Sequence, residues 1–198
     1  QSYFDGRFYA EARALYERRA EMAGWEEEGW YAAFRVGMCS LKLGEWDRAV
    51  GELLSAWQRR PGRAEPLHQL ARAARIRSSS HIAMLAADRA LAIPFPEQDS
   101  LFIDGVAYQH GPIEEISISA YYTGEFERGI AACDALLRSR DIPATVKHRA
   151  ASNSSYYAHP ISACDARRMD IPYHISAPNY VPMNSSIHRT EDGYVVMN

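Results

Sequence analysis

Lysine and cysteine are both scarce in this sequence of 198 residues. Lys42 and Lys147 are its two lysines, so arginine supplies the remaining 20 of the 22 basic side chains, which biased genome composition explains better than selection for bidentate anion contacts. The three cysteines, Cys39, Cys133 and Cys164, are too few and odd in number for a disulfide framework. We therefore predict reduced thiols in a cytoplasmic protein, with Cys39 and Cys133 buried as small apolar side chains.

Several chemical motifs are also missing. No apolar run reaches 18 residues, and no basic segment followed by an apolar one opens the chain, so neither a membrane span nor a signal peptide is expected. The sequence has no phosphate-binding loop, no dinucleotide fingerprint and no Asp-x-Asp pair. Its net charge of −3 creates no general attraction for nucleic acid. We expect no cofactor, no metal and no nucleic-acid partner.

The composition that remains is that of a folded globular chain. Apolar residues make up 47% and charged residues 24% of the sequence, which is close to the average of globular domains. The length fits one domain, or one domain with a short appendage. The first residue is Gln1 rather than Met, which leads us to expect a piece of a longer polypeptide.

A pattern of small, turn and aromatic residues recurs along the chain. In residues 30–61 its members are Gly37, Gly44, Trp46, Ala49, Leu53, Ala56 and Pro61. A step of 34 residues places Ala71, Ser78, Ala83, Ala87 and Ala90 at matching positions. After an insertion of about 12 residues, a third copy contains Gly124, Phe126, Gly129, Cys133 and Leu136. Internal repeats of this length are typical of stacked helix pairs.

This pattern resembles the tetratricopeptide repeat (TPR). The resemblance implies an all-α fold for residues 1–158, a right-handed α-solenoid of antiparallel helix pairs. Residues 6–20 would be the second helix of a unit whose first helix is missing, and residues 143–158 a further helix. A helical bundle that is merely rich in alanine is the alternative. For the insertion at 97–109 we leave open whether it covers the groove or packs sideways.

The composition changes in residues 159–198. Prolines interrupt this stretch, and Asp192-Gly193 between two β-prone runs predicts a short β-hairpin. The hairpin either packs on the helices or begins a truncated β domain. The segment resembles the opening strands of a β-propeller blade. Together with stretches such as AYYTGEFERGIAACDALL, it is similar to the repeat regions of bacterial glycosyltransferases. That resemblance implies that any chemistry lies outside this chain.

The first helix of each pair in such a solenoid lines a concave groove. This predicts a ligand or partner groove with an aromatic and aliphatic end and a basic middle, in which two arginines bind a carboxylate or phosphate. The alternative is that these arginines pair with Glu65 and Glu114 or lie in solvent. The predicted groove residues are Tyr31, Phe34, Met38, His68, Arg72, Arg75, Glu114 and Tyr121.

Three functions follow from these observations. The first is a non-catalytic interaction or scaffold module that binds a protein or peptide partner in its groove. The alternative is an accessory region of a glycosyltransferase, which positions the acceptor or the catalytic domain. A third and weaker hypothesis is a hydrolase that uses Ser154, His159 and Asp165. Neither this triad nor a zinc site built from Cys164 and His174 has a supporting motif.

Overall fold

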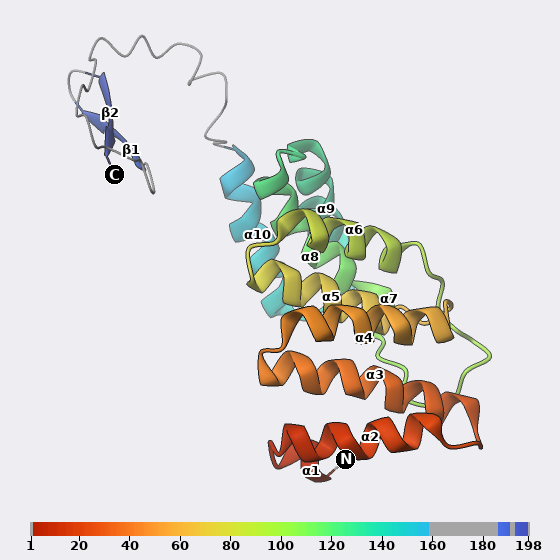
Figure 1. Ribbon diagram of the computed structural model, residues 1–198. Coiled ribbons are helices and arrows are strands. Elements are labelled where there is room, and N and C mark those ends of the chain that lie inside the picture. Colours follow the sequence, from red (N-terminus) through yellow and green to blue (C-terminus); the bar gives the residue numbers. More distant parts are fainter. Residues whose placement is uncertain (1, 159–185, 191–192, 198) are drawn as a thin grey trace, which may run out of the picture. The chain divides into compact units, whose positions relative to one another are not determined.

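A computed structural model describes residues 2–158, 186–190 and 193–197 of the chain (Figure 1). The chain divides into two compact units, Gln1–Ala158 and His159–Asn198. The first unit contains every described helix, and the second contains the described strands. The residues of the predicted proline-rich linker, with Cys164, Asp165 and His174, lie outside the described ranges.

Ten helices form the described part of the first unit. They are α1 (Ser2–Asp5), α2 (Tyr9–Glu21), α3 (Glu26–Leu43), α4 (Trp46–Arg59), α5 (Glu65–Ile76), α6 (Ser80–Leu91), α7 (Val106–Gln109), α8 (Gly111–Thr123), α9 (Phe126–Arg138) and α10 (Ala144–Ala158). The prediction of an all-α fold is confirmed for this unit. Helices were expected in 6–20 and 143–158, and α2 and α10 lie there. The four-residue helix α1 was not predicted.

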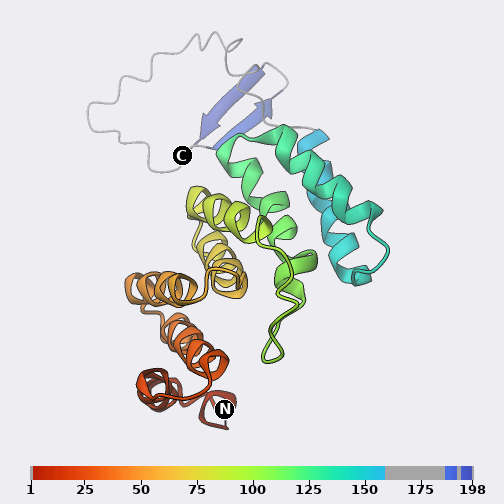
Figure 2. The same cartoon turned by 90° about the vertical axis from the view of Figure 1, so that its right-hand side faces the viewer.

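Neighbouring helices pack side by side in pairs. Short turns join α3 to α4, α5 to α6 and α8 to α9, and the members of each pair are in extensive contact. Each pair packs on the next through α4 with α5 and α6 with α8, while α2 and α10 pack on α3 and α9 at the two ends. Figure 2 shows this succession of pairs, with the helices from α2 to α6 viewed nearly along their axes.

The turn inside each pair has the same backbone conformation. Gly44, Ser78 and Gly124 have φ angles of 78°, 60° and 79°, which are left-handed. In each turn the next residue donates its N–H to a carbonyl five residues back, as in Glu45 to Ser40. This hydrogen bond is the mark of a Schellman cap, which ends a helix and reverses the chain. Ser78 thus adopts the glycine conformation although the sequence pattern loses glycine there.

The interior consists of small side chains between a few large ones. The main core cluster joins α3 to α9 and includes Trp30, Phe34, Leu53, Leu70, Met84 and Ile116. Alanines at the repeat positions, such as Ala49, Ala83 and Ala87, have no exposed surface, so neighbouring helices can approach closely. Cys39 and Cys133 are free and fully buried, which confirms their prediction as small apolar side chains.

The second unit is described only by two strands. β1 (Ser186–Thr190) and β2 (Gly193–Met197) pair antiparallel, with Ser186 opposite Met197 and Thr190 opposite Gly193. The predicted hairpin turn includes Asp192, which lies outside the described ranges. The truncated β domain therefore stays a prediction.

Candidate functional site

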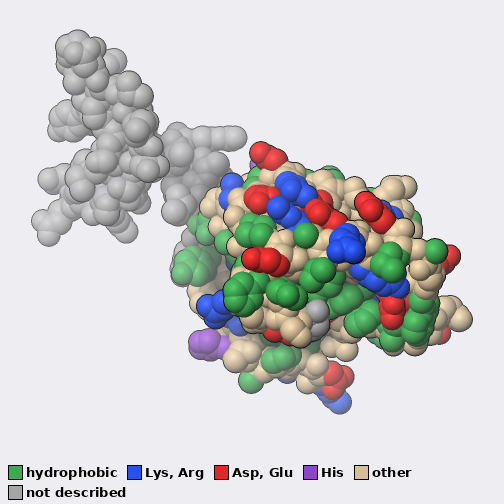
Figure 3. Space-filling view, turned by 60° about the horizontal axis from the view of Figure 1, so that its bottom comes forward, with side chains coloured by type: hydrophobic (Ala, Val, Ile, Leu, Met, Phe, Trp, Pro, Cys, Tyr) green, Lys and Arg blue, Asp and Glu red, His purple; other side chains and the backbone are tan. Residues whose placement is uncertain are grey.

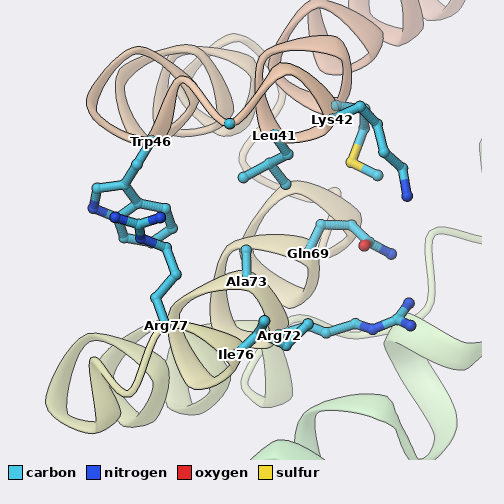
Figure 4. A pocket seen from close by; sticks show the side chains of 10 residues that line it. Leu41, Lys42, Trp46, Gln69, Arg72, Ala73, Ile76 and Arg77 are labelled. Carbon is cyan, nitrogen blue, oxygen red and sulfur yellow. The ribbon is translucent and has the colours of Figure 1, made fainter. Parts of the chain in front are cut away.

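A pocket opens between the carboxyl-terminal halves of α3 and α5 (Figure 4). Its volume is about 330 Å³. Two lining residues, Met38 and Arg72, are among the predicted groove residues. The complete lining consists of Met38, Leu41, Lys42, Gly44, Trp46, Gln69, Arg72, Ala73, Ile76 and Arg77.

The pocket combines an apolar floor with basic edges. Leu41, Ala73 and Ile76 lie in its middle, and the Ile76 side chain is 66% exposed. Figure 4 shows the long polar side chains of Lys42, Gln69 and Arg72 projecting to one side of this floor. On the other side, the Arg77 guanidinium lies over the Trp46 ring, 5.1 Å from its centroid.

The three cations at this pocket form no ion pair with any described residue. Within residues 2–158, neither Lys42 nor Arg72 nor Arg77 has a carboxylate within 4.0 Å of its charged nitrogens. The carboxylates on the facing helix α8 are already paired, Glu115 with Arg75 and Glu114 with Arg149. An exposed apolar floor bordered by unpaired cations is suited to a ligand that carries both aliphatic groups and negative charge.

Two predicted groove residues belong to the interior instead. Phe34 is 8% exposed and stacks on Trp30 with the ring centroids 5.8 Å apart. His68 is 5% exposed, and burial lowers its pKa to about 4. A Cβ on Gly111 would lie 2.5 Å from the His68 ring, so only glycine fits there. Neither Phe34 nor His68 offers a partner much surface.

Arg75 and Glu114 each have a partner within the chain. Arg75 donates from Nε to Glu115 at 2.5 Å, and Arg149 donates to Glu114 at 2.6 Å. Burial of the Glu115 carboxyl group raises its pKa, and its bond to Arg75 opposes that shift. Sequence reasoning treated Arg72 and Arg75 as one anion-binding pair, but the structure leaves only Arg72 exposed and unpaired.

Tyr31 and Tyr121 lie in two separate aromatic groups. Tyr121 packs with Phe126, Tyr156 and Tyr157 at centroid distances of 5.7–6.3 Å. The ring of Tyr31 is stacked on Phe102, a residue of the insertion. The predicted groove residues are therefore not one continuous surface, and Met38 and Arg72 are the two that the pocket brings together.

The insertion packs against the amino-terminal halves of α3 and α5. We call residues 92–105 the strap, and Figure 1 shows it running from α6 back along the stack to the level of α3. Asp99 lies at its centre and is bound by Arg60 and Arg63. These arginines hold the pKa of the Asp99 carboxyl group below its usual range. The strap thus covers the aromatic end of the predicted groove and leaves the basic pocket open.

Arg63 is the centre of this network, and the sequence did not single it out. Its side chain is fully buried, donates to both oxygens of Glu65, and lies 3.9 Å from the Trp30 ring centroid. Glu65 also accepts a hydrogen bond from the Tyr108 hydroxyl at 2.8 Å. No local sequence motif connects Asp99 with an arginine 36 positions earlier.

A second apolar surface lies at the α1–α2 end of the stack. Figure 3 brings this end forward and shows apolar side chains among mixed charges. α2 has Ala12 as its one buried residue, so most of its apolar side chains do not enter the core. The large apolar residues more than 45% exposed in this region are Tyr3, Phe8, Leu15, Met22 and Trp25.

Comparison of the chain with protein-family models, with curated proteins and with solved structures finds no match. The described residues contain no helix that is long and apolar enough to cross a membrane. Among the same residues, no group of three or more His, Cys, Asp or Glu side chains is arranged to hold a metal ion. The site has to be interpreted from its geometry.

Proposed function

We propose that the chain is a TPR-like interaction module whose α3–α5 pocket binds an extended, acidic segment of a protein partner. In this proposal the helix pairs form a right-handed solenoid of antiparallel helices. The ligand places an aliphatic side chain on Leu41 and Ile76 and its carboxylates near Lys42 and Arg72. The module is not catalytic by itself.

The repeated turn supports the solenoid part of the proposal. The same left-handed cap at Gly44, Ser78 and Gly124 gives each helix pair the same local geometry. Repetition of one geometry is what makes stacked pairs into a solenoid. Small residues at matching positions of the pairs allow the same close packing in each.

The observation that carries the binding proposal is the set of unpaired cations around an exposed apolar floor. Many other arginines of the described body are in ion pairs, such as Arg63, Arg75, Arg128 and Arg149. Lys42, Arg72 and Arg77 are not, and they border one pocket. Charged hydrogen bonds contribute about 1.5–3 kcal/mol each, so two such contacts would dominate recognition of a short segment.

A peptide selection tests this function. A random peptide library is displayed against the full chain, and the affinities of the selected peptides are measured by fluorescence anisotropy. We expect acidic peptides with an aliphatic residue. The double variant Lys42→Glu/Arg72→Glu should weaken their binding at least about tenfold, since each 1.4 kcal/mol corresponds to a factor of ten.

The matched control reverses two exposed arginines far from the pocket. Arg138→Glu/Arg140→Glu makes the same change in net charge and should leave the affinity within about twofold. Equal loss in both double variants would mean that only overall charge matters. Unchanged binding in Lys42→Glu/Arg72→Glu would place the ligand elsewhere and overturn the assignment of the pocket.

The glycosyltransferase hypothesis stays a prediction. No geometry in the described residues favours it over a free-standing interaction module.

A further inference from the structure

The strap contacts the helices through the kinds of interaction that hold a bound peptide. The first of these is the recognition of its acidic side chain, Asp99. Asp99 accepts hydrogen bonds from Arg60 Nε and from Arg63 Nη1, each at 3.0 Å. The second oxygen of Asp99 accepts from Arg60 Nη2. Its side chain is 6% exposed. Two guanidiniums around one buried carboxylate provide strong and geometrically specific recognition.

The backbone of the strap is recognised as well. Glu27 accepts hydrogen bonds from the N–H groups of Ser100 and Leu101, at 3.0 and 2.7 Å. Arg63 donates to the carbonyl oxygens of Leu101 and Phe102, at 3.3 and 2.9 Å. These contacts hold the bent segment through its main chain, so they do not depend on the identity of residues 100 and 101.

An aromatic ring completes the contact. Phe102 stacks on Tyr31 with centroids 3.9 Å apart and planes 9° from parallel. Its backbone has a φ of 57°, which is an outlier for a bulky residue. Such a conformation persists only when the surroundings impose it. Phe102 is still 47% exposed, so its ring lies on Tyr31 at the surface and is not part of the core.

We propose that Glu27, Tyr31, Arg60 and Arg63 form a second peptide-binding site, specific for Asp-x-x-aromatic segments, which this chain fills with its own residues 99–102. A partner that carries such a segment has to displace the strap. This inference uses the proposed role of the chain as an interaction module, but it concerns a different surface from the α3–α5 pocket.

A peptide competition tests the proposal. The probe is a fluorescent synthetic peptide of residues 97–104, and the host is the full chain with Asp99→Ala/Phe102→Ala, which releases the strap. An attached segment competes at an effective concentration in the millimolar range. We therefore expect the peptide to bind the released variant at least about tenfold more tightly than the unaltered chain.

Two controls identify the site. A peptide with Asp99→Asn and Phe102→Ala should lose binding to the released variant. Adding Tyr31→Ala to the released variant should weaken binding of the original peptide about tenfold, because the stacking partner is gone.

Three results would overturn the proposal. One is equal or absent binding of the peptide to the unaltered and released chains. Another is binding that survives Tyr31→Ala. The third is loss of helical circular dichroism both in the double variant and in Phe102→Ala alone, which would make the strap part of the structural core. Acidic peptides selected for the α3–α5 pocket should bind the released variant normally, so failure here leaves the proposed function standing.

Discussion

Gly37 of α3 lies directly against Leu53 of α4. A Cβ at position 37 would be 2.8 Å from both Cγ and Cδ2 of Leu53 and 3.2 Å from its backbone nitrogen. Leu53 is fully buried, so its side chain has little room to move. The repeat pattern therefore requires a small residue at position 37 because the large side chain of Leu53 on the paired helix fills the adjacent space.

Gly37→Ala should therefore destabilise the first unit. Overpacking of a well-filled core costs about 1–3 kcal/mol, and urea unfolding followed by circular dichroism measures the loss. The matched control is Gly51→Ala in α4, where a Cβ meets nothing within 4 Å. That change should stabilise by about 0.5–1 kcal/mol because alanine is the better helix former. Similar effects at both positions would contradict the packing argument.

Ser78→Gly should stabilise the protein. Ser78 has a φ of 60°, a left-handed conformation that costs a residue with a Cβ about 1–2 kcal/mol. Glycine removes most of this cost and restores the residue found in the other two caps. The control is Ser152→Gly in the interior of α10, which should destabilise by about 0.5 kcal/mol. Thermal unfolding of both variants measures the two changes, which should be a higher Tm for Ser78→Gly and a lower Tm for Ser152→Gly.

Arg63→Met should be among the most damaging single changes. Methionine retains much of the apolar stem, but it leaves Asp99 with Arg60 alone and the buried Glu65 without its guanidinium. Breaking one side of a buried ion pair costs about 3–5 kcal/mol. The comparison is Arg138→Met, which removes an exposed pair with Asp134 and should cost less than about 1 kcal/mol. Chemical denaturation of the two variants measures the difference.

Stability should fall with acid partly because of His68. Burial lowers its pKa from about 6.5 to about 4, so between these values the unfolded chain binds a proton that the folded chain does not. The contribution is complete above pH 6.5 and is lost as the pH falls toward 4, about 3 kcal/mol in all. His68→Gln should flatten this part of the pH profile of unfolding, whereas the exposed His81→Gln should not. Parallel profiles for His68→Gln and the unaltered chain would show that His68 is not responsible.

Contacts between neighbouring helices could be predicted from sequence because they repeat. Gly37, Ala49 and Leu53 occupy positions where one spacing recurs, and that spacing predicted the helix pairs. The position of Arg72 at an exposed surface followed from the same periodicity. The local sequence pattern was therefore sufficient to predict contacts between helices that follow one another along the chain.

The strap could not be predicted in this way. Glu27 and Leu101, which share a hydrogen bond, are 74 residues apart, and no periodic signal joins them. The partner of Arg75 could not be identified for a related reason, since Glu115 is 40 residues away on α8. A charged side chain at a groove position can form an ion pair with a residue on a helix of another pair. Sequence spacing alone does not identify that residue.

The long-range bonds of the strap also bear on how the chain folds. Helix pairs close over short loops and form quickly, because little chain entropy is lost in each closure. Contacts such as Glu27 with Leu101 and Arg63 with Asp99 can form only after α3, α4 and α5 have assembled. We therefore expect the strap to dock after these helices have packed and to detach before they separate. The amides of Ser100 and Leu101 should exchange with solvent before those of the helices beneath them.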